Sequence, residues 1–465
     1  SIRRTRYNSR ELPRTQTSVL LMVRPAALQC SSFQKLDSSK LKTGFRAALA
    51  VSRPGLRRGR FSIGIHRSTP LAMNASTEKV FVVGGGIIGT SIAYYLSKRG
   101  LSPVVIERSD IASAASGKAG GFLARDWGIG TVTQHLHQVS FDLHEDLAKE
   151  LGIDSFRRLP TLSVEGGKPK GRQQKQSQAS WLDGEIRQLK VLDTGTAQVT
   201  PAEITRALMD AALRNGAALR NAAVTGVRTE PKDGGGRRLT GLCLEGGEVL
   251  DAGTAVFAMG PWSSLAGDWL GVPIPMEGVK STSIVYSGCD SARDEPFALF
   301  CAEDSNGCHL EVFPRPNGDV YICGCGGSDY VGGERLASGG DCEAPEKILP
   351  DPQRVKAASA SFAGLSSLGA REPDLTQACM RPCPPDALPI MGKAPGTEGA
   401  YLACGHNCWG ILWGPVTGLA MSELIADGNA SCVDLAPFSP SRFMPRKGAG
   451  ARGRKRGLQA VGEQW

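Results

Sequence analysis

The segment that most constrains the fold of this chain is residues 79–107, KVFVVGGGIIGTSIAYYLSKRGLSPVVIE. An apolar run leads into Gly84-x-Gly86-x-x-Gly89, a helix-like segment follows, and a second apolar run ends at Glu107. This order predicts a strand, a tight turn, a helix and a parallel strand, as in a dinucleotide-binding βαβ unit. A glycine-rich turn in some other α/β protein is the weaker alternative.

Each glycine has its own role in this prediction. Gly84 makes the tight turn, Gly86 lets a pyrophosphate approach the backbone, and Gly89 lets the helix pack on the sheet. The helix N-terminus offers unpaired N–H groups and a positive dipole end to phosphates. Glu107 has the spacing of a carboxylate that accepts hydrogen bonds from adenosine ribose. The motif alone does not separate FAD from NAD.

Small residues and glycines follow the acid in residues 107–123, which suits a segment lying close to a long cofactor. The chain resembles the FAD-dependent oxidoreductases of the D-amino acid oxidase superfamily, of the glycine oxidase and sarcosine oxidase type, over roughly residues 78–430. The motifs that carry this resemblance include SGKAGGFLA, VTPAEITRALMDAALRNGAAL (199–219), AVFAMGPWSSLA (255–266), RPCPPDALPIMG (381–392) and ACGHNCWGILWGPVTGLAMSELIADG (403–428).

The resemblance implies an α/β fold in which a Rossmann-like FAD-binding domain is interleaved with an α+β substrate domain built on an antiparallel sheet. The predicted boundaries are 1–75 for a transit peptide or disordered extension, 76–150, 199–270 and 376–432 for the FAD-binding domain, 151–198 and 271–375 for the substrate domain, and 433–465 for a basic disordered tail.

The late motif predicts a second helix N-terminus, after Gly405, that faces the flavin pyrimidine edge. Its dipole would stabilise negative charge near N1 and O2 of a reduced flavin. Without the other motifs, Trp409 and Trp413 would be assigned to the core. The predicted FAD-binding residues are Gly84, Gly86, Ile87, Ile88, Gly89, Glu107, Arg108, Ala115, Ser116, Gly120, Gly121, Phe122, Val224, Gly260, Trp262, Gly405, His406, Asn407, Trp409, Gly410, Ile411 and Leu412.

Arg381 is the leading substrate residue. In the glycine oxidase pattern an Arg-Pro pair ahead of an acid binds the substrate carboxylate, and here Arg381-Pro382 precedes Asp386. A guanidinium group matches a carboxylate with two parallel hydrogen bonds. The alternative is that Arg381 pairs with a local acid such as Asp386.

Two departures from that pattern affect the predicted substrate site. Glu311 stands where the resemblance expects a tyrosine, and Cys408 stands where it expects a second arginine. We predict that Glu311 holds a substrate ammonium or a basic side chain, with a solvent-facing strand residue as the alternative. His406, His309 and Lys280 are candidates for proton handling.

The chain has thirteen cysteines and no CxxC motif, which favours a reducing compartment and buried thiols. No metal is predicted, and a zinc site at Cys404 and Cys408 is a minor alternative. Cys379 has the spacing from Asp386 of the cysteine that attaches the flavin in sarcosine-oxidase-like proteins. We favour non-covalent FAD, with a covalent bond to Cys379 as the alternative.

The net charge of +9 is unevenly distributed. Residues 1–75 contain fifteen Lys/Arg and two acids, and residues 442–465 contain seven Lys/Arg and one acid, so residues 76–441 are acidic. This distribution argues against a nucleic-acid partner. The first 75 residues, rich in Arg and Ser, predict a plastid transit peptide, with a mitochondrial one or a disordered cytosolic extension as alternatives. No apolar run approaches the roughly 20 residues of a transmembrane helix.

These features predict an FAD-dependent oxidoreductase that oxidises the C–N bond of a small amino or imino acid by hydride transfer to flavin N5. The electrons pass on to O₂ in an oxidase, or to another acceptor in a dehydrogenase. A non-catalytic FAD-binding assembly or interaction factor is the alternative, and an NAD-dependent dehydrogenase disagrees with the late motif.

Overall fold

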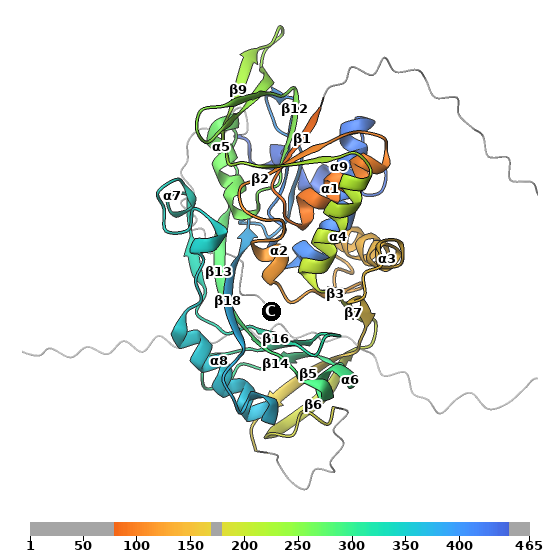
Figure 1. Ribbon diagram of the computed structural model, residues 1–465, viewed down its shortest axis with the longest axis vertical. Coiled ribbons are helices and arrows are strands. Elements are labelled where there is room, and N and C mark those ends of the chain that lie inside the picture. Colours follow the sequence, from red (N-terminus) through yellow and green to blue (C-terminus); the bar gives the residue numbers. More distant parts are fainter. Residues whose placement is uncertain (1–78, 169–178, 446–465) are drawn as a thin grey trace, which may run out of the picture. The chain divides into compact units, whose positions relative to one another are not determined.

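The computed structural model describes residues 79–168 and 179–445, all of which fall in one compact unit (Figure 1). The predicted transit peptide, residues 1–75, lies outside the described residues. Within them the predicted α/β fold is confirmed: a mostly parallel sheet is combined with a separate antiparallel sheet.

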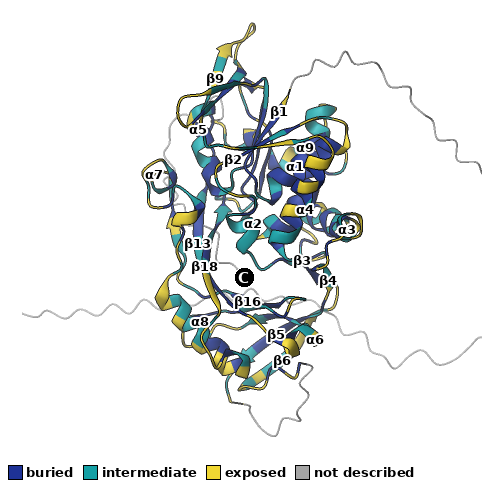
Figure 2. Cartoon of the chain, in the orientation of Figure 1, coloured by how far each residue is buried: buried dark blue, intermediate teal, exposed yellow. Residues whose placement is uncertain are grey.

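The parallel sheet has the strand order β19-β21-β12-β1-β2-β8 in the described part of the chain. Only β19 runs antiparallel to its neighbour, β21. β1 is central and fully buried, as its unbroken apolar sequence predicts for a strand covered on both faces (Figure 2). The bounds are β1 Val80–Val83, β2 Val104–Glu107, β8 Ala218–Asn221, β12 Thr254–Phe257, β19 Ile390–Lys393 and β21 Ala400–Cys404.

The two faces of this sheet are covered differently. Val80 and Val82 of β1 pack with helices, whereas Phe81 and Val83 pack with a small sheet and the short helix α5. The helices are α1 Ile87–Lys98, α3 Gln134–Leu151, α4 Pro201–Arg214 and α9 Gly410–Ala426, with α5 at Ala266–Leu270. The small sheet contains β9 Val224–Pro231, β10 Arg237–Leu244, β11 Val249–Asp251 and β20 Thr397–Glu398.

The antiparallel sheet is the larger one, with eight strands in the described residues, and its one parallel pair there is β14 with β5. Its order is β17-β13-β16-β15-β14-β5-β6, and β18 pairs with the other side of β13, so that these two long strands run side by side (Figure 1). The bounds are β5 Thr161–Gly166, β6 Ile186–Asp193, β13 Glu277–Tyr286, β14 Ala298–Cys301, β15 Glu311–Pro314, β16 Val320–Cys323, β17 Asp329–Val331 and β18 Leu375–Cys383.

The remaining elements connect these layers. Helix α8 packs on the face of the antiparallel sheet that carries Val312 and Ile322. The other helix bounds are α2 Ala115–Lys118, α6 Asp290–Asp294, α7 Gly333–Leu336 and α8 Pro352–Leu365. The strands β3 Phe122–Ala124, β4 Arg157–Arg158 and β7 Thr196–Gln198 form a fourth, three-stranded sheet.

Two details differ from the sequence prediction. Segment 376–432 was assigned to the FAD-binding domain, but its first strand, β18, belongs to the antiparallel sheet. The predicted disordered tail at 433–465 is wrong for its first part, because residues 433–445 form two short 3₁₀-helices in which Phe438 is buried against the core. The rest of that tail lies outside the described residues.

Two glycines of α9 bring it close to α1. A Cβ added to Gly414 would lie 2.6 Å from Ile87 Cγ1, and one added to Gly418 would lie 2.6 Å from the backbone carbonyl carbon of Ser91. Both distances are shorter than van der Waals contact, so the glycines set the spacing of the two helices.

We expect Gly418→Ala to destabilise the protein by about 1–3 kcal/mol, because the new methyl group meets the backbone of α1. Urea denaturation of the FAD-loaded protein measures this change. Gly364→Ala in the exposed part of α8 is the matched control: no atom lies within 4 Å of its added Cβ, and alanine favours the helix. A Gly418→Ala variant as stable as the control would contradict the close packing.

Candidate functional site

A single cavity brings the predicted site residues together in the described part of the chain. Every predicted FAD-binding residue lines this cavity except Gly89 and Leu412, and Arg381, Glu311 and His406 also line it. A Cβ at Gly89 would lie 1.9 Å from the Gly84 carbonyl oxygen, and Leu412 is buried in the core on α9. These two positions therefore support the site through packing.

The glycine loop exposes its backbone to the cavity because no side chain fits there. Gly84 has a φ of +113°, its N–H donates to the Ile106 carbonyl at 2.8 Å, and a Cβ on it would lie 2.5 Å from the Ala258 oxygen. A Cβ on Gly86 would lie 3.0 Å from Ser116 Oγ. A backbone cradle at the start of α1 suits a pyrophosphate, so these residues fit the FAD that the sequence predicts.

Glu107 has a role that its spacing did not reveal. One of its carboxylate oxygens accepts the Gly85 N–H at 2.6 Å and the other accepts the Ser109 N–H at 2.9 Å. Burial raises the pKa of this carboxyl group, and the backbone hydrogen bonds act in the opposite direction. Glu107 therefore ties the glycine loop to the end of β2.

A tight turn forms the other end of the cavity, immediately before α9. Gly405 has a φ of +76°, and a Cβ on it would lie 2.6 Å from Pro384. Asn407 adopts a φ of +50°, which is uncommon outside glycine, and its side-chain oxygen accepts the Cys383 thiol at 3.1 Å. The first residues of α9, Gly410 and Ile411, line the cavity.

His406 is a neutral anchor of this turn. Its Nε2 lies 3.0 Å from Thr417 Oγ1, and the Thr417 hydroxyl donates to Met391 Sδ at 3.4 Å. The Thr417 oxygen therefore accepts from the imidazole. Burial lowers the pKa of His406 to about 3. This environment therefore favours the neutral imidazole, which does not supply a proton near neutral pH.

Helix α9 contains a proline, and two side chains of α3 form hydrogen bonds with the backbone groups that the proline leaves unpaired. Pro415 has no N–H, so the Ile411 carbonyl lacks its usual helical donor. His144 Nε2 lies 2.9 Å from that carbonyl oxygen, which requires the proton to be on Nε2. The next N–H, of Val416, donates to Ser140 Oγ at 3.1 Å. Residues of α3 thus hold the first turn of α9 in place.

Arg381 reaches the cavity from β18, where it is paired in register with Val279 of β13. Asp386, its suggested local partner, is instead engaged by Arg442, whose Nε lies 2.8 Å from the carboxylate. Asp386 therefore has a partner other than Arg381, and pairing of Arg381 with another local acid stays an alternative.

Glu311 lines the cavity, so the alternative in which it is a solvent-facing strand residue is wrong. Along β15, Glu311 and Phe313 line the cavity, whereas Val312 between them packs in the core with α8. The Cys323 thiol on the adjacent strand donates to the Glu311 carboxylate at 3.5 Å. Burial raises the pKa of Glu311, while this thiol and the charge of Arg381 act in the opposite direction.

Of the aromatic side chains near Glu311, sequence reasoning predicted Phe122 and missed the other three. Phe122 stacks on Phe313 with ring centroids 5.5 Å apart and lies 5.1 Å from both Trp127 and Phe300. All four line the cavity. The alternation of β14 and β15 was visible in the sequence, but which face of each strand meets the cavity depends on the pairing of distant strands.

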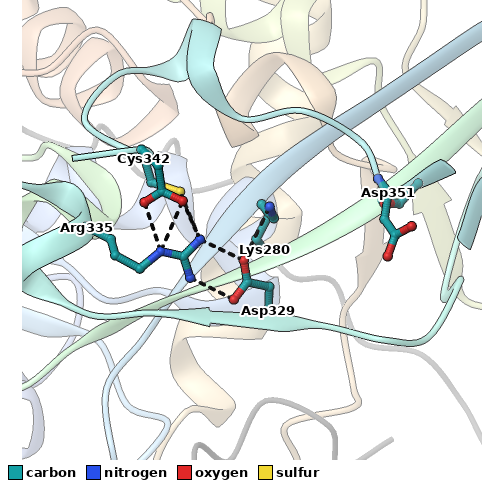
Figure 3. Close-up of polar contacts among 7 residues, drawn as sticks. Lys280, Asp329, Arg335, Cys342 and Asp351 are labelled. Atoms are coloured by element: carbon teal, nitrogen blue, oxygen red, sulfur yellow. Dashed lines mark hydrogen bonds and ion pairs between the residues drawn. The ribbon is translucent and has the colours of Figure 1, made fainter. Parts of the chain in front are cut away.

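The other two candidates for proton handling, His309 and Lys280, lie in different places. His309 lines the cavity, but Lys280 does not and pairs with Asp329 at 3.3 Å (Figure 3). Asp329 also pairs with Arg335, which binds Asp341 as well. Lys280 therefore belongs to an ion-pair network that attaches residues 329–341 to β13.

The cysteines of the described residues are free thiols. Cys379 lines the cavity, and burial raises its pKa. In the described ranges, no group of three or more His, Cys, Asp or Glu side chains is placed to hold a metal ion. Nor does any helix there have the length and apolar character required to cross a bilayer.

A glycine loop, a parallel sheet and a shared cavity with an antiparallel sheet define a dinucleotide-dependent oxidoreductase. Residues 79–424 match the family model DAO, FAD dependent oxidoreductase, over most of the chain, so the protein belongs to this family and uses FAD.

Two curated relatives are similar over nearly their whole length. Hydrogen cyanide synthase subunit HcnC of Pseudomonas aeruginosa is 25% identical over 441 residues, covering 80% of this chain and 98% of the relative. Glycine oxidase of Geobacillus kaustophilus is 25% identical over 409 residues, with coverage of 79% and 98%. The crystal structure of the Geobacillus kaustophilus enzyme matches with a TM-score of 0.61 at 24% identity, covering 79% of this chain and 100% of that one, which shows a shared fold.

We expect Glu107→Gln to weaken FAD binding about 10-fold to 100-fold, because the loop N–H groups lose a charged acceptor. Titration of apoprotein with FAD, followed by flavin fluorescence, measures the affinity. Glu303→Gln, in an exposed loop, is the control. FAD affinity equal to that of the wild type would contradict the role of Glu107.

We expect stability to fall as the pH drops from 6.5 to 4. Burial lowers the pKa of His144 from 6.5 to about 4, so the unfolded chain binds more protons in this window. His144 should contribute about 3 kcal/mol to the fall in the free energy of unfolding across this window, and His406, with its pKa lowered to about 3, adds to it. Urea denaturation at each pH should show a smaller fall in His144→Asn, which keeps an N–H donor but does not titrate. His135→Asn, at an exposed position, should match the wild type.

Proposed function

We propose that this protein oxidises the C–N bond of a small amino or imino acid whose carboxylate binds Arg381. The observation that carries the proposal is that Arg381 and the turn before α9 line the same cavity as the glycine loop. The similarity to a glycine oxidase supports an amino acid as the substrate class.

The glycine loop and Glu107 would hold the adenosine diphosphate part of FAD, and the turn from Gly405 to Ile411 would lie beside the flavin. When bound, FAD supplies the two-electron acceptor for a hydride from the substrate Cα–H bond at flavin N5. The partial positive charge at the start of α9 favours negative charge developing near it.

The chain's own residues then orient the substrate and exclude water. The Arg381 guanidinium fixes a carboxylate, which limits rotation of the α-carbon. Phe122, Phe300, Phe313 and Trp127 cover an apolar part of the cavity. The resulting imine hydrolyses in water without help from a charged histidine, in agreement with the neutral His406.

We infer that FAD is bound non-covalently. The competing arrangement has a bond from Cys379, whose sulfur also lines the cavity. Acid precipitation separates the two: free FAD remains yellow in the supernatant, whereas attached FAD sediments with the protein. We also propose O₂ or another electron acceptor as the second substrate, and a plastid as the compartment on the basis of the basic, acid-poor residues 1–75.

We expect Arg381→Met to lower kcat/KM for amino acid substrates about 100-fold or more, because the carboxylate of the bound substrate loses its charged partner. Anaerobic bleaching of the flavin by glycine, sarcosine and proline measures the reaction. Arg442→Met, which removes the pair with Asp386 outside the cavity, is the control.

Failure of every amino and imino acid to bleach the wild-type flavin would contradict the proposal. That result would favour a non-catalytic FAD-binding factor.

A further inference from the structure

The cavity contains one buried acid that the proposed reaction has not used. Glu311 lies at the start of β15 and points to the same side of the sheet as Phe313. The pairing of β15 with its neighbours places Phe300 of β14 and Cys323 of β16 directly opposite it. All of these side chains line the cavity, so the carboxylate lies on a wall that is otherwise aromatic or thiol.

This carboxylate has few partners in the described part of the chain. Its hydrogen bond there comes from the Cys323 thiol, a weak donor, and the charges of Arg381 and His309 also act on it. A buried carboxylate without a strong partner is costly. A cation entering the cavity would provide a strong partner for this charge.

The position of Arg381 limits what that cation is. Arg381 lines the same cavity, and the charges of Arg381 and Glu311 each act on the pKa of the other. Cys408, where the glycine oxidase pattern has a second arginine, adds no fixed charge. Arg381 and Glu311 therefore place a guanidinium and a carboxylate in one cavity, which matches the two charges of an α-amino acid zwitterion.

Resting on the proposed function, we propose that Glu311 forms an ammonium subsite: it binds the protonated amino group of the substrate whose carboxylate binds Arg381. The ammonium proton passes to the Glu311 carboxylate before the hydride leaves Cα, because only the neutral amine has the lone pair that drives hydride transfer. Glu311 is then a specificity-determining residue. It selects amino acids that carry a positive charge on nitrogen over carboxylates of the same shape without one.

Two unreactive probes of nearly equal shape test this subsite in the FAD-loaded protein. 2-Aminoisobutyrate has an ammonium and no Cα–H bond, so it cannot be oxidised, and pivalate has a methyl group in place of the ammonium. Perturbation of the flavin absorption spectrum reports their binding without turnover. In the wild type we expect 2-aminoisobutyrate to bind at least 10-fold more tightly than pivalate at pH 7.

We expect Glu311→Gln to weaken 2-aminoisobutyrate at least 10-fold and to leave pivalate unchanged or tighter. Glu311→Asp, which keeps the charge, should retain part of the preference, and Glu303→Gln should bind both probes as the wild type does. Thermal unfolding and the flavin spectrum verify that each variant is folded.

Three outcomes would overturn the subsite. Equal weakening of both probes in Glu311→Gln would show that the residue only supports the cavity structurally. Unchanged binding of both probes would show that it does not contact the amino group. Failure of the wild type to bind either probe would contradict the carboxylate site at Arg381, and so the proposed function, rather than the subsite alone.

Discussion

The close packing of α1 against α9 is the constraint on which the arrangement of the site depends. Gly414 and Gly418 bring α9 against Ile87 and Ser91. Each helix begins at one end of the cavity: α1 at the glycine loop and α9 at the turn after Gly405. A side chain at Gly418 would meet the backbone of α1 and one at Gly414 would meet Ile87, so this close packing helps to set the distance between the two N-termini.

The proline in α9 places a second demand on this arrangement. A break at Pro415 would let the first turn of the helix move relative to the rest, yet this turn carries Gly410 and Ile411 at the cavity wall. His144 and Ser140 of α3 restore hydrogen bonds on both sides of the break. The repair requires His144 to be neutral, since a second ring proton would be buried without a partner. Geometry at the cavity and stability in mild acid therefore depend on the same imidazole.

Short sequence motifs were enough to predict the residues of the glycine loop. Contacts between segments far apart in the sequence could not be predicted in the same way. The roles of Gly84 and Gly89 follow from the backbone of one turn, so 29 consecutive residues are enough to infer them. The bond from Gly85 to Glu107 and the hydrogen bonds of His144 join segments whose approach no local pattern encodes. Arg381 was found through a motif, although its strand belongs to the other sheet.

Glu311 shows why strand residues are harder to assign than turn residues. Period-two alternation divides β15 into two faces, but either face is compatible with the sequence until its neighbours are known. In the structure the face with Val312 packs on α8, and the opposite face meets the cavity. The cavity face of β15 belongs to the antiparallel sheet rather than the parallel one, and it lies opposite the face that packs on α8. If Glu311 forms the proposed ammonium subsite, a change of charge there would alter what the cavity binds while the glycine loop stays the same, and substrate selection and cofactor binding would be separable properties of this fold.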